Sequence, residues 1–159
     1  MGTKSKIVGG TAAAAVIALA TPFIAKWEGV EYRAYRDIVG VPTICYGETR
    51  GVRMGDTATP AECRAMLQAA VAEYYAGVAR CITHPAVPVG VQASMTELAY
   101  NVGVAPVCRS TMMRRANAGD WRGACDELRK WVKAGGSTVR GLSNRRADSK
   151  ASLCLRGLP

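Results

Sequence analysis

An uncharged run of nineteen residues, from Ile7 to Ala25, is the feature that most constrains how this chain can fold. As a helix it would be roughly 28 Å long, about the thickness of a bilayer's hydrocarbon core. Lys4 and Lys6 precede the run, so the positive-inside rule predicts an N-terminus inside the cell and the remaining chain outside. Because the run is mostly Ala, Gly and Thr, we expect its membrane insertion to be marginal.

This run has several interpretations. Ala18-Leu19-Ala20 offers the small-x-small cleavage site of a signal peptide. Low hydrophobicity disfavours a permanent anchor and best fits a weak anchor that can later leave the membrane, while a buried core helix is a further alternative. We predict a division into an N-terminal membrane segment, residues 1–25, and a domain of residues 26–159.

The chain after this segment alternates Ala-, Leu- and Met-rich stretches with Gly and Pro, which predicts one mostly helical domain. Thr59 can cap a helix whose third position is Glu62, and helical periodicity continues to Ile82. This long helix is expected to link two lobes. Residues 37–47 are β-branched and broken by Gly and Pro, which indicates a small hairpin or sheet. Other helices are expected over residues 26–36, 89–101, 107–118, 120–133 and 139–155.

The formal net charge is +9, from twenty-one Lys and Arg against twelve Asp and Glu. Such a field attracts polyanions, among them nucleic acid, acidic lipid and the anionic bacterial wall. The basic residues are scattered in pairs, and we find no zinc-finger spacing, basic zipper or aromatic platform for single strands. Nucleic acid is therefore not a predicted partner.

Six cysteines stand in the chain, without a Cys-x-x-Cys motif and with His84 as the one histidine. This composition does not predict a metal site. The cysteines are either disulfides, which export would favour, or small buried hydrophobic residues. The sequence alone leaves all pairings open among Cys45, Cys63, Cys81, Cys108, Cys125 and Cys154.

Glu28, Asp37 and Thr43 follow the apolar run with a Glu-x8-Asp-x5-Thr spacing. Glycoside hydrolysis needs one acid that protonates the leaving oxygen and a second carboxylate that assists water. Glu28 can be the acid and Asp37 can activate the water, which the hydroxyl of Thr43 can hold. These three residues are the candidate catalytic set.

A longer pattern around these residues resembles the active-site block of the phage-type lysozymes, glycoside hydrolase family 24. The resemblance covers about residues 26–156 and includes several ordered motifs. They are Trp27-Glu28-Gly29, Ala34-Tyr35-x-Asp37, Gly40-x-x-Thr43-Ile44-x-Tyr46-Gly47, Leu98-Ala99-Tyr100-Asn101-Val102-Gly103, Ser110-Thr111, Asn117-x-Gly119-Asp120-Trp121, Trp131-x-x-Ala134-Gly135-Gly136 and Gly141-Leu142-x-x-Arg145-Arg146.

The resemblance implies an α+β, mostly α, two-lobed lysozyme fold with a small β-hairpin or sheet lobe, a long connecting helix and a helical C-terminal lobe. It implies hydrolysis of the β-1,4 bond between N-acetylmuramic acid and N-acetylglucosamine in bacterial peptidoglycan, without a cofactor and with inversion. Glu28, Asp37 and Thr43 take the catalytic roles described above. Supporting or substrate-binding roles near the cleft fall to Asn101, Trp131 and Arg145.

Two positions depart from the family pattern. Glu48 stands where many members carry His, so a His contact to the helical lobe is not expected. The chain has an acidic residue at Asp148, whereas family members often carry a Glu one or more positions further along the chain.

The N-terminal segment resembles that of signal-arrest-release endolysins. This implies a protein tethered to the inner membrane through residues 7–25, facing the periplasm, and later released there, with a functional link to a holin or pinholin. A monomer is expected. No cysteine lies within residues 7–25, which favours control by topology over thiol exchange. The predicted layout suggests the pairs Cys45–Cys63, Cys81–Cys108 and Cys125–Cys154.

Three alternatives are kept beside this interpretation. A lytic transglycosylase would cut the same bond with the sugar's own hydroxyl and would need only Glu28. A non-enzymatic, membrane-anchored wall-binding protein would not need Glu28 at all. A cationic membrane-disrupting protein would lyse cells whatever its active-site residues.

Overall fold

The computed structural model describes residues 5–158, with side chains from residue 10 onward. The start of the predicted membrane segment, including Lys4, and Pro159 lie outside the described residues. The elements, in chain order, are α1 (Ser5–Glu28), β1 (Glu31–Arg36), β2 (Pro42–Cys45), α2 (Pro60–Ala79), α3 (Val89–Val102), α4 (Val104–Cys108), α5 (Thr111–Asn117), α6 (Trp121–Asp126), η1 (Glu127–Lys130), β3 (Lys133–Ala134), β4 (Ser137–Thr138), α7 (Arg140–Ser149) and η2 (Lys150–Cys154). The predicted fold class, mostly helical with small antiparallel sheets, is confirmed.

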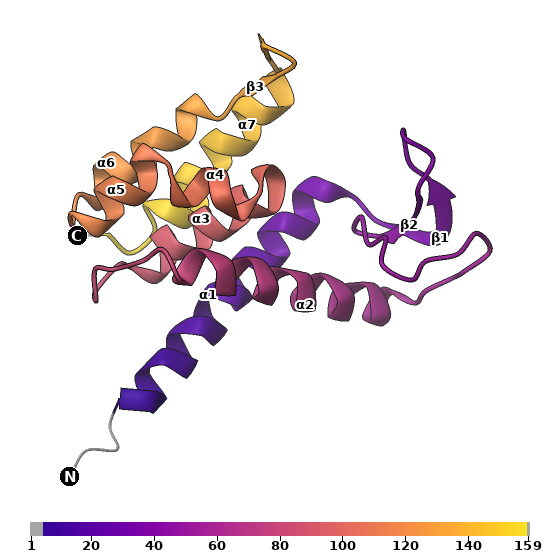
Figure 1. Ribbon diagram of the computed structural model, residues 1–159, viewed down its shortest axis with the longest axis horizontal. Helices are drawn as coiled ribbons and strands as arrows, with labels where there is room; N and C mark the ends of the chain where they lie inside the picture. Colours follow the sequence, from indigo (N-terminus) through magenta and orange to yellow (C-terminus); the bar gives the residue numbers. More distant parts are fainter. Residues whose placement is uncertain (1–4, 159) are drawn as a thin grey trace.

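Helix α1 buries one face of its C-terminal half. Val16, Ala20 and Ile24 recur at four-residue spacing and pack against apolar side chains of α2 and α3. Ala14 and Ala18 lie on the opposite, exposed face. The N-terminal part of α1 projects away from the rest of the molecule (Figure 1). Part of the run Ile7–Ala25 therefore contributes to the folded core.

The small lobe is a β-hairpin in which β1 pairs antiparallel with β2. The helix predicted over residues 26–36 is wrong: α1 ends at Glu28 and residues 31–36 form β1. Gly29 follows the helix with φ of 69°, a left-handed conformation that ends helices and that glycine adopts without strain. The strand exposes every side chain except Ala34, so it carries little of the apolar alternation that predicts a strand.

Helix α2 begins where the sequence predicts. The Thr59 hydroxyl accepts the Glu62 backbone N–H at 3.2 Å, and the Glu62 carboxylate accepts the Thr59 backbone N–H at 2.7 Å, which closes a capping box. The helix ends at Ala79, before the predicted Ile82. It runs from the β-hairpin to the helical lobe and so connects the two, as predicted (Figure 1).

The helical lobe surrounds α3, whose side chains from Ala93 to Ala99 are all buried. The predicted helix over 107–118 is broken where Ser110 caps the start of α5. The one over 120–133 is also wrong at its end, because η1 leads into a β3–β4 hairpin. Gly135 and Gly136 form its turn with φ of 57° and 82°. The predicted helix over 139–155 is observed as α7 and a wider π-type turn, η2.

Three disulfides hold the two lobes. They join Cys45 to Cys63, Cys81 to Cys108 and Cys125 to Cys154, the pairs that the predicted layout suggests. The first links β2 to α2, and the other two lie within the helical lobe. A disulfide stabilises a fold largely by restricting the unfolded chain.

Candidate active site

Glu28 is the last residue of α1 and lies at the edge of a cavity of about 530 Å³. Its Oε1 accepts a hydrogen bond from Arg145 Nη1 at 2.8 Å, and 27% of its side chain is exposed. Tyr35 of β1 and Tyr46 of the following loop line the same cavity. The carboxyl group therefore faces space that a ligand can enter while one of its oxygens is fixed by a cation.

Arg145 is itself held by a buried carboxylate. Its Nε donates to Glu97 Oε1 at 2.5 Å, and Arg146 Nη1 donates to the two Glu97 oxygens at 2.8 and 2.9 Å. Glu97 is fully buried, and 5% of Arg145 and 1% of Arg146 are exposed, so this arginine pair is not a solvated surface pair. We name Glu28, Glu97, Arg145 and Arg146 the buried ion network. It places two cations against two carboxylates.

In this network burial and the neighbouring carboxylates shift the arginine pKa values in opposite directions. Burial alone lowers the pKa of Arg145, but the attraction of Glu97 and Glu28 outweighs it and raises that pKa above its ordinary value. For Arg146 burial dominates and lowers the pKa. Arginine remains charged in either case because its ordinary pKa lies far above neutrality. The network thus keeps a fixed cation beside Glu28.

Asp37 and Thr43 lie on either side of the tip of the β1–β2 hairpin. The Asp37 Oδ1 atom accepts the backbone N–H groups of Val39 and Val41 at 3.0 and 2.9 Å. The Val41 carbonyl in turn accepts the Asp37 backbone N–H at 3.0 Å and the Thr43 hydroxyl at 2.9 Å. Residues 37–43 therefore fix the carboxylate and the hydroxyl relative to each other. Thr43 also lies opposite Tyr35, which lines the Glu28 cavity.

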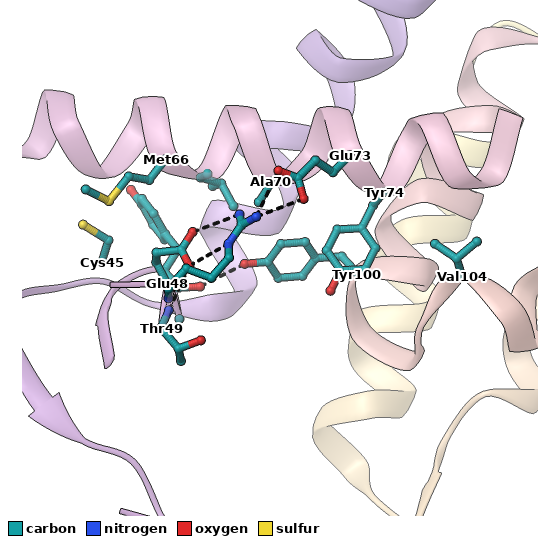
Figure 2. Close-up of a pocket in the computed structure, with 13 residues that line it drawn as sticks. Cys45, Glu48, Thr49, Met66, Ala70, Glu73, Tyr74, Tyr100 and Val104 are labelled. Atoms are coloured by element: carbon teal, nitrogen blue, oxygen red, sulfur yellow. Dashed lines mark hydrogen bonds and ion pairs between the residues drawn. The ribbon is translucent and has the colours of Figure 1, made fainter. Parts of the chain in front are cut away.

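A second cavity, of about 420 Å³, continues along the loop after β2 (Figure 2). It shares Cys45, Tyr46 and Gly47 with the first cavity, so the two cavities adjoin at this loop, and we name the adjoining pair the groove. Tyr100 of α3 closes this groove from the helical side and donates from its hydroxyl to the Tyr46 carbonyl at 2.9 Å. Burial, helped by the charge of Glu28, raises the pKa of Tyr100 to about 12.

Glu48 reaches the long helix through an arginine. Arg50 Nε lies 3.3 Å from Glu48 Oε1, and Arg50 Nη1 lies 3.2 Å from Glu73 Oε1 in α2. In Figure 2 dashed lines mark these contacts between Glu48 and Glu73. The lobes thus keep a polar contact at the position where the sequence departs from the family's histidine.

Asn101 and Trp131 meet the buried ion network rather than the groove. Asn101 Oδ1 accepts from Arg146 Nη2, and the Trp131 carbonyl accepts from Arg146 Nε at 3.2 Å. Neither residue is among those lining the two cavities. Both therefore support Arg146 in this structure, and a direct contact with substrate stays a prediction.

Sequence reasoning missed Glu97 and Tyr100 as individual functional positions. An acidic residue inside an otherwise uncharged helix is a signal that would have pointed to Glu97, because buried carboxylates need cationic partners. Among residues 5–158 no cluster of three or more His, Cys, Asp or Glu side chains has an arrangement suited to a metal ion.

Comparison with known proteins identifies the family. The model of the phage lysozyme family matches residues 25–149. The SAR-endolysin of Enterobacteria phage P21 is 43% identical over 135 residues, which cover 82% of this chain and 78% of that relative. The SAR-endolysin of Pseudomonas phage phiKMV is 41% identical over 146 residues, 89% of each chain. An endolysin from the Escherichia coli O157:H7 phage FAHEc1 shares the fold with a TM-score of 0.75 and 28% identity, covering 91% of this chain and 92% of that one. The expected lysozyme-like fold is confirmed, and the chain belongs to the phage lysozyme family.

Proposed function

We propose that this protein is a phage endolysin whose muramidase activity depends on Glu28, Asp37 and Thr43. It hydrolyses the β-1,4 bond between N-acetylmuramic acid and N-acetylglucosamine and so opens the peptidoglycan of the host. The observation that carries the assignment is Glu28 at the edge of the groove, held there by Arg145, which Glu97 holds in turn. The excess of positive charge draws the enzyme toward the anionic wall.

The reaction separates into proton donation and water attack. Glu28 donates its proton to the glycosidic oxygen as the bond from that oxygen to the anomeric carbon breaks. A water molecule donates hydrogen bonds to the Asp37 carboxylate and to the Thr43 hydroxyl oxygen. This water attacks the anomeric carbon from the other face. Asp37 takes the proton that the water loses, and the new carbon–oxygen bond has inverted stereochemistry.

The hairpin contacts favour hydrolysis over the transglycosylase alternative. A lytic transglycosylase uses the sugar's own hydroxyl as nucleophile and has no need for a water site. Here Asp37 and Thr43 are both fixed through the Val41 backbone, and the Thr43 hydroxyl proton is already donated. We infer that these two acceptors orient one water.

Product analysis tests this proposal. The full chain is incubated with isolated peptidoglycan, and the fragments are analysed by mass spectrometry beside those from Glu28→Gln and from Asp126→Asn, an acid-to-amide control outside the groove. We expect reducing muramic acid ends from the parent and the control, and a loss of activity of at least about 10²-fold for Glu28→Gln. Anhydro-muramic ends would establish a transglycosylase instead. Equal activity of Glu28→Gln and parent would reject the active site.

The second part of the proposal concerns residues 1–25, which act as a signal-arrest-release segment ahead of a catalytic domain of residues 26–159. Within the described residues one helix, Gly10–Glu28, has the length and apolar composition to cross a membrane, and 22% of it is buried in the folded domain. A core helix would be mostly buried, so the low buried fraction supports a membrane role. The relatives from phages P21 and phiKMV are named SAR-endolysins, which supports the proposal of a signal-arrest-release segment here.

In the tethered form residues 7–25 span the inner membrane and the domain faces the periplasm. Lys26, Trp27 and Glu28 then lie at the membrane surface, so Glu28 cannot reach Arg145 and the enzyme is inactive. Displacing a catalytic group by even about 1 Å can cost two orders of magnitude in rate. Membrane depolarisation, supplied in the host by a holin or pinholin, releases α1, which packs on α2 and α3 of the monomer in the periplasm.

Substitutions on the exposed face of α1 test the tether. Ala14→Leu with Ala18→Leu makes the segment more hydrophobic without entering the folded core, because both positions are exposed there. We expect this variant to stay in the membrane fraction after depolarisation and to delay lysis, while Ala14→Ser with Ala18→Ser, the matched pair, shortens the delay. Fractionation and lysis timing in cells give the readout. Identical timing for the two variants would contradict tether control.

A further inference from the structure

The end of α1 meets α7 at a second point besides the Glu28–Arg145 pair. Asp148 Oδ2 accepts a hydrogen bond from Lys26 Nζ at 2.7 Å and from Trp27 Nε1 at 2.9 Å. We name Lys26, Trp27 and Asp148 the α1–α7 clasp. It lies outside the two cavities and joins residues 121 and 122 positions apart in the chain.

The clasp carboxylate is fixed from both sides. Its other oxygen, Oδ1, accepts the Ser152 hydroxyl at 3.0 Å, and that hydroxyl also lies 2.7 Å from the Asp148 carbonyl. Partial burial raises the pKa of Asp148, but the hydrogen bonds from Lys26, Trp27 and Ser152 outweigh it and lower that pKa below its ordinary value. The carboxylate is therefore ionised at neutral pH and held in one orientation.

The two contacts between α1 and α7 have opposite polarity. Helix α7 presents the cation of Arg145 and, three residues later on the same face, the anion of Asp148. Helix α1 places the Glu28 carboxylate against Arg145 and, two residues earlier in the chain, the Lys26 ammonium against Asp148. A rotation or slide of α1 would break both pairs. The contacts thus define one register for the last turn of α1.

We propose that Asp148 is a positioning residue for the reaction: by holding Lys26 and Trp27 it sets the register in which Glu28 meets Arg145 at the groove. Asp148 touches neither the groove nor Glu28 and acts through the last turn of α1. The inference rests on the proposed role of Glu28 as the acid. In the tethered form Lys26 and Trp27 are at the membrane surface, so the clasp closes only after release.

Kinetics of the soluble full chain on purified glycan chains test this role. Asp148→Asn removes the charge that holds Lys26 and is expected to lower kcat about 10-fold with little change in KM, because the groove is untouched. Asp126→Asn, which removes a comparable surface ion pair to Lys150, is the control and is expected to keep the parental kcat. A kcat for Asp148→Asn within about 2-fold of the parent would overturn the proposal.

A charge swap separates positioning from simple loss of stability. Lys26→Glu and Asp148→Lys are each expected to lower kcat, because each places like charges in the clasp. The double variant restores opposite charges at positions 26 and 148 and is expected to recover part of the lost kcat, because a lysine cannot accept the Trp27 Nε1 hydrogen bond. A double variant no better than the worse single variant would overturn the proposal. Full activity of Glu28→Gln would show that the proposed catalytic site is wrong. Full activity of Asp148→Asn together with an inactive Glu28→Gln would reject the clasp alone.

Discussion

Asp37→Asn is expected to lower kcat on isolated peptidoglycan by about 10²–10⁴-fold, the range typical for loss of a general base. The amide oxygen can still accept the Val39 and Val41 N–H groups, so the hairpin tip keeps its shape and only the charge and basicity are removed. Binding of the glycan is expected to change little, because the loss falls on a step that occurs after binding.

Asp56→Asn is the matched control for this result. Asp56 is also a loop carboxylate of the hairpin lobe, and its Oδ2 accepts the Arg53 backbone N–H at 2.8 Å. If loop stability were the cause, both variants would lose activity together. If Asp37 and Thr43 hold the same water, Asp37→Asn combined with Thr43→Ala will cost little more than Asp37→Asn alone. Activity of Asp37→Asn close to that of the parent would remove Asp37 from the mechanism.

Glu97→Gln is expected to lower the free energy of unfolding by about 3–5 kcal/mol, the usual cost of removing one partner from a buried ion pair. The substitution leaves Arg145 and Arg146 buried against a single carboxylate, Glu28. For a chain of this size the midpoint of thermal unfolding is expected to fall by about 6–20 °C. Calorimetry or circular dichroism of the soluble full chain measures the shift.

A second substitution shows whether charge imbalance causes the loss. Arg146→Met added to Glu97→Gln restores electrical balance in the buried ion network and is expected to raise stability above that of Glu97→Gln alone. If the double variant is instead less stable, packing and hydrogen bonding outweigh charge there. Asp126→Asn, which loses only a surface ion pair, is expected to unfold close to the parent.

Local chemistry made some elements predictable from the sequence. The start of α2 follows from Thr59, Pro60 and Glu62, because a capping box acts within one turn and needs no tertiary contact. The long connecting helix and the helical nature of the C-terminal lobe were predicted from a second local signal, the helical periodicity of apolar residues. Glu28, Asp37 and Thr43 were predicted from their spacing together with the family resemblance, and the structure places them at the end of α1 and on the hairpin.

Long-range interactions account for what the sequence did not reveal. Glu28 ends a helix instead of lying inside one, because Gly29 turns the chain and β1 then pairs with β2. Arg145 and Arg146 are buried because Glu97, about fifty residues earlier, provides their counter-charge. Neither the pairing partner of a strand nor the partner of a buried ion can be read from local propensity.

The three disulfides and α1 occupy separate parts of the chain. The bridges span residues 45–154, and none reaches the helix that precedes them. In the release that we propose, docking of α1 onto α2 and α3 therefore makes and breaks no covalent bond, and it is a binding reaction within one molecule. In such a reaction a short connection gives an effective concentration in the millimolar range, so even a weakly apolar helix face can saturate its site. The disulfide-linked part of the chain, residues 45–154, then provides the binding site for α1 of the same molecule.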